Sequence, residues 1–133
     1  MSKLRIAAKA ENMEQVMAFV NGELETRDCS AKARTQLDVA VDELFSNIAR
    51  YAYGEETGEA VIRMEFPDGY AEITFLDYGV PYNPLERPNP DITIPADERP
   101  IGGLGVYIVK KSMDSVSYRY EDGKNILTIR KKL

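Results

Sequence analysis

The longest regular pattern in this chain lies between Ser30 and Tyr53, where apolar residues recur every three or four positions. That spacing places them on one face of a helix of about six turns. Ser30 is a residue type that caps helix starts, and Gly54 is one that follows helix ends. A helix this long with a single apolar face must pack that face on a second layer of the protein. The expected inward face consists of Ala33, Leu37, Val41, Leu44, Ile48 and Ala52.

The rest of the chain supplies that second layer as short segments with the alternation that is typical of strands. Pro67-Asp-Gly69 and Asp122-Gly123 are turn sequences, and each separates two such segments, which predicts two hairpins. The remaining elements expected are a strand at 3–8, a helix at 11–26, strands at 60–66 and 70–76, a helix at 105–114, and strands at 115–120 and 125–130.

This order of elements predicts an α+β fold, namely a two-layer α/β sandwich with a mixed, mostly antiparallel sheet and the helices on one face. The length of 133 residues and the lack of a linker predict one domain that spans 1–133. Six of the seven prolines fall within 80–101, and a segment of that length without a regular pattern predicts a functional or flexible loop.

Composition removes several classes of function. The formal net charge is −5 and no basic stripe is present, which argues against nucleic-acid binding. The chain has no histidine and one cysteine, Cys29, which excludes a Ser-His-Asp triad, a Cys-His dyad, a histidine-ligated metal and an intrachain disulfide. The first residues lack a signal-peptide pattern and no run is long enough to span a membrane, so a cytoplasmic protein without a membrane partner is expected.

Glu43 and Asn47 form the first of three short patterns that carry chemistry. They are four residues apart, so they share one face of the long helix, and Tyr51 continues the same row. The row flanks the apolar face, where a carboxylate and an amide could border a cleft while the helix stays packed. Taken alone, such a pair is more often a solvated helix edge.

Asp77 and Gly79 form the second pattern, at the end of the strand predicted at 70–76. A buried carboxylate at this point could accept a hydrogen bond from an exocyclic amine such as that of adenine, and a glycine lets the backbone approach a flat ring. Taken alone, an ordinary strand-to-loop turn explains the pattern at least as well.

Gly102-Gly-Leu-Gly105 forms the third pattern and precedes the last predicted helix. The backbone N–H groups of a glycine-rich turn and of a helix start suit phosphate oxygens. Taken alone, the glycines are better explained as a hinge. They do not complete a Rossmann fingerprint, and Gly123-Lys124 does not complete a P-loop, because each lacks further residues that the motif requires.

Together, in this order and at this separation, the three patterns resemble the nucleotide site of the ATPase domains shared by gyrase, MutL and histidine kinases. Within that superfamily the chain most resembles the RsbW-like anti-sigma serine kinases. The resemblance runs from about Leu37 to the C-terminus and includes Ala52-Tyr-Gly54 and Ile126-Leu-Thr-Ile-Arg-Lys131. It implies a histidine-kinase-like ATPase domain with the Bergerat ATP-binding fold, and ATP and Mg²⁺ as cofactors.

Through the resemblance, each pattern acquires a role in phosphoryl transfer from ATP. The implied roles are Glu43 as general base, Asn47 as Mg²⁺ ligand, Asp77 as acceptor for the adenine amine, Gly79 beneath the ring, Gly103, Leu104 and Gly105 around the phosphates, and Thr128 near adenine through water. Tyr51 stands where many relatives have histidine. For Arg87 and Arg99, ordinary exposure to solvent is the favoured interpretation. The alternative is a contact with the γ-phosphate or with a partner protein.

The leading functional hypothesis is a protein-serine kinase that sequesters a sigma factor and phosphorylates an anti-sigma factor antagonist in a partner-switching pathway. The alternative is a non-catalytic, ATP-dependent protein-binding switch module. A third hypothesis is an interaction domain that binds no nucleotide. A homodimer is expected from the resemblance alone.

Overall fold

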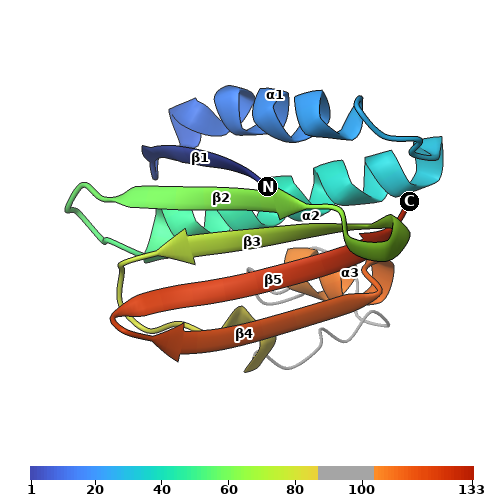
Figure 1. Cartoon of the computed structure of the whole chain (residues 1–133). Coiled ribbons are helices and arrows are strands. Elements are labelled where there is room, and N and C mark those ends of the chain that lie inside the picture. Colours follow the sequence, from blue (N-terminus) through green and yellow to red (C-terminus); the bar gives the residue numbers. More distant parts are fainter. Residues whose placement is uncertain (87–103) are drawn as a thin grey trace.

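The computed structural model describes residues 1–86 and 104–133 as a layer of helices on a β-sheet (Figure 1). The predictions for Arg87, Arg99, Gly102 and Gly103 therefore lie outside the described residues. The elements in chain order are β1 (Ser2–Ala7), a 3₁₀ turn (Ala10–Asn12), α1 (Met13–Leu24), α2 (Ala31–Tyr51), β2 (Glu59–Glu65), a 3₁₀ turn (Pro67–Gly69), β3 (Tyr70–Asp77), a 3₁₀ turn (Pro84–Glu86), α3 (Leu104–Ser112), β4 (Ser115–Glu121) and β5 (Lys124–Lys132).

The sheet has the strand order β1-β2-β3-β5-β4, and each pair of neighbouring strands is antiparallel. The predicted two-layer α+β arrangement is confirmed, and the sheet, expected to be mixed, has no parallel pair among the described strands. β3 and β4 run in the same direction, because each is antiparallel to β5, which lies between them. Strands that run the same way need a long crossover, and α3 is part of that crossover.

Both predicted hairpins are present, and their turns contain residues in the left-handed backbone region. Asp68 has a φ of 53° and Gly69 a φ of 83° between β2 and β3, while Asp122 at 53° and Gly123 at 75° join β4 to β5. Glycine adopts this region without strain, and aspartate tolerates it better than most residues. The turn sequences therefore set which strands pair along the chain.

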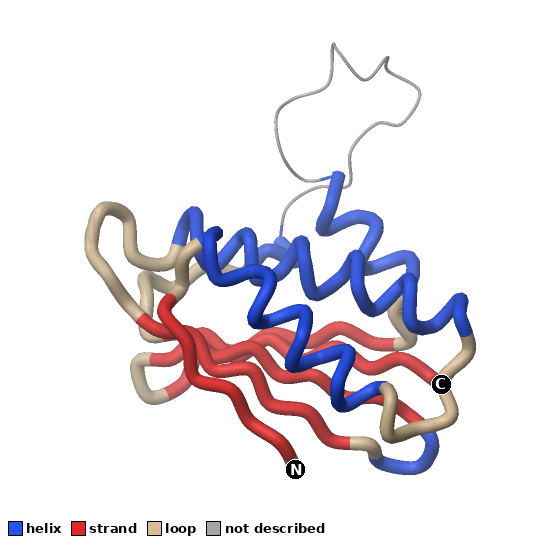
Figure 2. The backbone as a smooth tube through the Cα atoms, turned by 90° about the horizontal axis from the view of Figure 1, so that it is seen from above, coloured by secondary structure: helices blue, strands red, loops and turns tan. Residues whose placement is uncertain are grey.

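The helices of the described residues, α1, α2 and α3, cover the same face of the sheet, as Figure 2 shows from above. α2 begins as predicted, because the Ser30 Oγ accepts a hydrogen bond from Ala33 N at 3.1 Å. Its buried face is wider than predicted, since Phe45 and Asn47 are also buried. Burying a side chain such as Phe45 stabilises the fold by about 1.5–3 kcal/mol, which anchors α2 to the sheet. In the described part of the chain, no helix has the length and apolar composition that crossing a membrane requires.

The two faces of the sheet carry different side chains because successive strand residues alternate between them. Phe75 and Leu127 are paired across β3 and β5 and belong to the main core under the helices. Leu76 and Ile126, the next pair along, form a small cluster with Val61 on the opposite face. By the same alternation, the last residue of β3 faces the helices at the edge of the core.

Candidate functional site

Asp77, the last residue of β3, pairs with Asn125 near the start of β5. Both residues are buried, with exposed fractions of 5% and 6%. Asn125 Nδ2 donates to Asp77 Oδ1 at 2.9 Å, and Gly79 N donates to the same oxygen at 2.9 Å. Among the described residues, Asp77 Oδ2 has no hydrogen-bond partner. The carboxylate is thus held by one oxygen and keeps the other for a ligand.

Burial raises the pKa of the Asp77 carboxyl above its usual range, and the hydrogen bonds from Asn125 and Gly79 oppose that rise. An ionised carboxylate only accepts hydrogen bonds. Tyr53 and Tyr118 lie close enough to be affected by the charge of Asp77, and burial raises the pKa of both phenols. A phenol is neutral or negatively charged, so neither tyrosine supplies a positive charge that would lower the pKa of Asp77.

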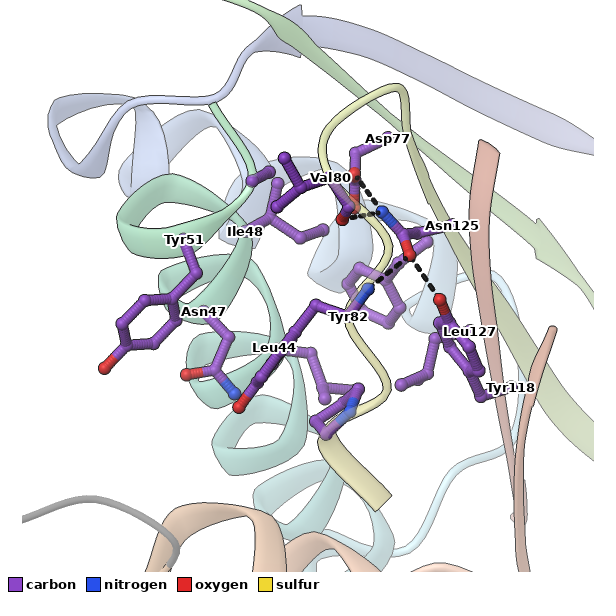
Figure 3. Close-up of a pocket in the computed structure, with 13 residues that line it drawn as sticks. Leu44, Asn47, Ile48, Tyr51, Asp77, Val80, Tyr82, Tyr118, Asn125 and Leu127 are labelled. Carbon is purple, nitrogen blue, oxygen red and sulfur yellow. Dashed lines mark hydrogen bonds between the residues drawn. The ribbon is translucent and has the colours of Figure 1, made fainter. Parts of the chain in front are cut away.

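A pocket lies between the last turns of α2 and the adjoining ends of β3 and β5 (Figure 3). It encloses about 450 Å³ of space between atoms, part of which is open to solvent. Apolar walls with a few fixed polar groups are typical of sites for small molecules with flat rings. Its apolar lining consists of Leu44, Ile48, Ala52, Phe75, Val80, Pro84 and Leu127, and its polar lining of Asn47, Tyr51, Asp77, Tyr82, Tyr118 and Asn125.

Asn47 borders this pocket from α2 and is only 9% exposed. Its amide has no hydrogen-bond partner within the described segments. Buried amides are normally paired, so this one is suited to a ligand atom. Figure 3 shows the Tyr82 side chain reaching from the loop after β3 toward Asn47 and Tyr51, and the two tyrosine rings are 5.8 Å apart.

Glu43 lies one turn closer to the start of α2, where that helix meets the beginning of α3. Gly105 packs against its carboxylate so closely that a Cβ at position 105 would lie 1.9 Å from Glu43 Cδ. Glu43 has no hydrogen-bond or ion-pair partner in the described chain, so its carboxylate is available to accept a proton. The N–H groups at the start of α3, which begins at Leu104, favour negatively charged groups at this place.

Gly79 makes a close approach to α2. A Cβ there would lie 2.1 Å from Ala52 O, and Val80 N donates to the same oxygen at 3.0 Å. The sequence predicts that this glycine allows contact with a ligand ring, whereas the contact seen in this structure is with the end of the helix. The loop after Asp77 is therefore fastened directly to α2.

Tyr53 fastens the same loop through its hydroxyl group. The hydroxyl accepts a hydrogen bond from Tyr78 N at 2.8 Å and donates one to Glu59 O at 2.6 Å. Gly58 lies against the ring, since a Cβ there would be 2.3 Å from ring atoms. Tyr53 thus links α2, the start of β2 and the residue after Asp77, which gives a physical reason for a tyrosine at this position.

Thr128 lies on the opposite face of the sheet from Asp77. Thr128 pairs with Thr74 of β3, and the Oγ1 atoms of the two residues are 3.3 Å apart. The structure does not bring Thr128 to the pocket, so the adenine contact predicted for it has no support in this geometry. Asn125 occupies the pocket instead and was not predicted. The sequence does hold a signal for Asn125, because it is a polar residue on the same face of the strand as the apolar Leu127 and Ile129.

The residues present fit a Mg²⁺ ion that arrives with a nucleotide. Mg²⁺ prefers oxygen ligands and is commonly held by one or two protein groups together with substrate phosphates. The residues that the structure describes contain no group of three or more acidic, cysteine or histidine side chains that could hold a metal ion. Asn47 offers an unpaired carboxamide oxygen, and Glu43 lies one helical turn away.

A family model and several curated proteins are similar to this chain. The family model of the histidine kinase-like ATPase domain matches residues 6–131. The serine-protein kinase RsbW of Bacillus thuringiensis (strain Al Hakam) is 29% identical over 129 residues, which cover 94% of this chain and 81% of the relative. The serine-protein kinase RsbW of Bacillus mycoides (strain KBAB4) is 27% identical with the same coverage.

Two solved structures share the fold at low sequence identity. The RsbU and RsbW domains of Rv1364c from Mycobacterium tuberculosis superpose with a TM-score of 0.64 at 13% identity, covering 100% of this chain and 33% of the other. This chain thus spans about a third of that longer protein chain. The Acinetobacter baumannii histidine kinase AdeS gives a TM-score of 0.52 at 15% identity, covering 99% and 68% of the two chains.

Proposed function

Because the chain belongs to the histidine kinase-like ATPase domain family, we propose that it binds Mg-ATP and transfers the γ-phosphoryl group to a serine of another protein. The observation that carries this proposal is the arrangement along α2. Asp77 lies at one end of the pocket, and Glu43 and Gly105 meet at the start of α3. Asn47 lies between them on the helix. Similarity to two serine-protein kinases of the RsbW type supports the choice of serine.

The adenine base would occupy the pocket next to Asp77. Asp77 Oδ2 would accept a hydrogen bond from the exocyclic amine, since Oδ1 already accepts from Gly79 N and Asn125 Nδ2. Ile48 and Val80 would pack against the faces of the ring. An acceptor at this point favours adenine over guanine, whose carbonyl oxygen would face the carboxylate.

The phosphates would extend along α2 toward the start of α3. Leu104 and Gly105 would provide backbone N–H groups for phosphate oxygens, and the same role stays a prediction for Gly103. The Asn47 carboxamide would ligate Mg²⁺. When bound, that ion would neutralise charge on the phosphate oxygens and so lower the barrier to phosphoryl transfer.

Glu43 would act as the general base in the transfer step. Its carboxylate would take the proton from the serine hydroxyl as the serine oxygen forms a bond to the γ-phosphorus. The bond between that phosphorus and the oxygen bridging to the β-phosphate breaks, and ADP leaves. The position of Glu43 beside Gly105 supports this role, because it puts a carboxylate without a partner next to the proposed phosphate site.

The partner proteins follow from the resemblance to RsbW-like kinases. The chain would bind a sigma factor and phosphorylate a small anti-sigma factor antagonist, and phosphorylation of the antagonist would release it. A homodimer is part of the same proposal. The chain would act in the cytoplasm.

Two measurements, made one after the other, test the proposal. Mg-ATP at 100 times its Kd should stabilise the protein by about 2.7 kcal/mol, and Mg-GTP should stabilise it much less. The protein that co-purifies with the chain should then acquire phosphoserine from labelled ATP. Stabilisation by Mg-ATP without phosphoserine would reject the kinase and leave the ATP-dependent switch module. If the stability of the protein is the same with and without Mg-ATP, both the kinase and the switch module are rejected.

A further inference from the structure

Asn125 uses all the hydrogen-bonding capacity of its side chain around the pocket. Its Nδ2 donates to Asp77 Oδ1 at 2.9 Å and to Val80 O at 2.8 Å. Its Oδ1 accepts from Tyr82 N at 3.0 Å and from the Tyr118 hydroxyl. A carboxamide has two donor hydrogens and two acceptor lone pairs, so no capacity remains for a ligand.

These partners also fix which way the Asn125 amide points. Val80 O can only accept, so it must face the amino group, and Tyr82 N can only donate, so it must face the carbonyl oxygen. A flipped amide would lose both bonds and leave buried polar groups unpaired. The amino group is therefore the part of Asn125 that meets Asp77.

That orientation decides what Asp77 presents to the pocket. With Gly79 N and Asn125 Nδ2 both donating to Oδ1, the carboxyl group is held in one rotation, with Oδ2 left for a ligand. A donor on a neighbouring group stabilises the ionised form of a carboxyl, which accepts hydrogen bonds and does not donate them. We propose that Asn125 is a positioning residue that makes Asp77 an obligatory acceptor and so sets the preference for a 6-amino purine over a 6-oxo purine.

This inference rests on the proposed function, because it assumes that the pocket holds a purine nucleotide. The two purine classes differ at the position that Asp77 would read. Adenine carries an amine that donates there, whereas hypoxanthine and guanine carry a carbonyl oxygen. Two acceptors facing each other in a buried site leave both unpaired, which lowers affinity for the oxo base.

Loss of Asn125 would change the chemistry of Asp77 as well as its position. Burial raises the pKa of the Asp77 carboxyl, and the largest opposing contribution comes from Asn125. Without it, the protonated carboxyl becomes more populated and can donate from its O–H group to a carbonyl oxygen. The other ionisable groups affected by Asp77, Tyr53 and Tyr118, carry no positive charge in either protonation state, so neither provides an ion pair that would keep the carboxyl ionised.

The test compares the affinities of ATP and inosine triphosphate, both with Mg²⁺, for wild-type protein and Asn125→Leu. Leucine is close to asparagine in size but removes every hydrogen bond. The ratio of the two affinities should favour ATP in the wild type and should fall about tenfold in the variant, as expected for one unpaired buried polar group. A residue that only supports the loop would lower both affinities together and leave their ratio unchanged, and that result would overturn the inference.

Two further variants complete the experiment. Serine is smaller than asparagine and leaves room for water. If Asn125→Leu does not fold, the ratio of the affinities for ATP and inosine triphosphate is therefore measured on Asn125→Ser. Thr128→Val is the matched control, because it lies three residues along the same strand on the opposite face and should keep the wild-type ratio. Wild-type protein that binds neither nucleotide would reject the proposed function and this inference with it. Nucleotide binding with an unchanged ratio in both Asn125 variants would reject this inference alone.

Discussion

The Cα of Gly105 lies against the carboxylate of Glu43, with no room between them for a side chain. A Cβ at position 105 would be 1.9 Å from Glu43 Cδ and 2.2 Å from Oε2. Real Cβ atoms do not approach other atoms this closely, so only glycine allows the start of α3 to meet the acidic side chain. This contact joins two of the three sequence patterns at one point.

Gly105→Ala should reduce phosphoryl transfer while leaving the fold intact. The new methyl group meets the end of a flexible side chain, so Glu43 can rotate away at small cost in unfolding free energy. Displacing a base by about 1 Å can lower the rate about 100-fold. Single-turnover phosphorylation measures the loss. Gly22→Ala on α1 is the control, since nothing lies within 4 Å of its Cβ and its rate should match the wild type.

Glu43→Gln should separate nucleotide binding from catalysis. The amide keeps the size of the side chain but cannot take a proton from serine, so transfer should fall by about 100-fold to 10,000-fold. The Kd for Mg-ATP should stay within about threefold of wild type, because Glu43 is not assigned a contact with adenine. Calorimetric titration and a phosphoserine assay give the two quantities. Full transfer activity in this variant would exclude Glu43 as the base.

Asp77→Asn should reverse the purine preference and remove a pH dependence. Its Oδ1 would still accept from Gly79 N and Asn125, which turns an amino group toward the ligand and disfavours ATP relative to inosine triphosphate. In wild type, ATP affinity should weaken as the pH falls through the raised Asp77 pKa, above the ordinary value of 3.8. Subtracting the Asp77→Asn titration cancels the protonation of ATP itself. Parallel titrations of the two proteins would contradict the assignment.

The same substitution makes a prediction about stability whose sign follows from burial. A folded-state pKa above 3.8 means that ionisation of Asp77 costs folding free energy at higher pH. That cost is lost as the pH falls from the folded-state pKa to 3.8. As the pH falls through that window, the unfolding free energy of the wild type should therefore rise relative to that of Asp77→Asn. Denaturant unfolding at several pH values measures this difference.

Gly79→Ala should destabilise the protein itself, in contrast to Gly105→Ala. Its Cβ would lie 2.1 Å from Ala52 O, a backbone atom that cannot rotate away. Overpacking of this kind costs about 1–3 kcal/mol, and the loop that carries Val80 and Tyr82 should shift with a loss of ATP affinity. A lower denaturant midpoint with an unchanged m-value would show the effect on stability. Wild-type stability and affinity would mean that the loop is not fastened to α2.

The helices, strands and turns could be predicted from the sequence because their local signals agree with the tertiary structure. Ser30 caps α2, and Asp68-Gly69 and Asp122-Gly123 form the two hairpin turns. The row through Glu43, Asn47 and Tyr51 was also predictable, since it depends only on helical spacing. All of these features are set by residues close together along the chain.

Contacts between residues that are far apart along the chain could not be predicted from the sequence. Asn125 meets Asp77 only through the register of β5 on β3, 48 positions away. A shift of one residue exchanges the two faces of a strand, so the residue of β5 that reaches the pocket depends on this register. Thr128 was named through the family resemblance alone, and the register places Asn125 at the pocket instead. The contact of Gly105 with Glu43 likewise needs the packing of α3 on α2, which no local pattern encodes.

β5 follows every other described element in chain order, yet it lies between β3 and β4 in the sheet. During synthesis, the emerging polypeptide can therefore make its helices and first three strands while Asp77 still lacks its neighbour. Binding of ATP should begin only once β5 has been synthesised and has paired with β3 and β4. A stalled ribosome series that releases chains of increasing length would show this as an abrupt onset of ATP retention.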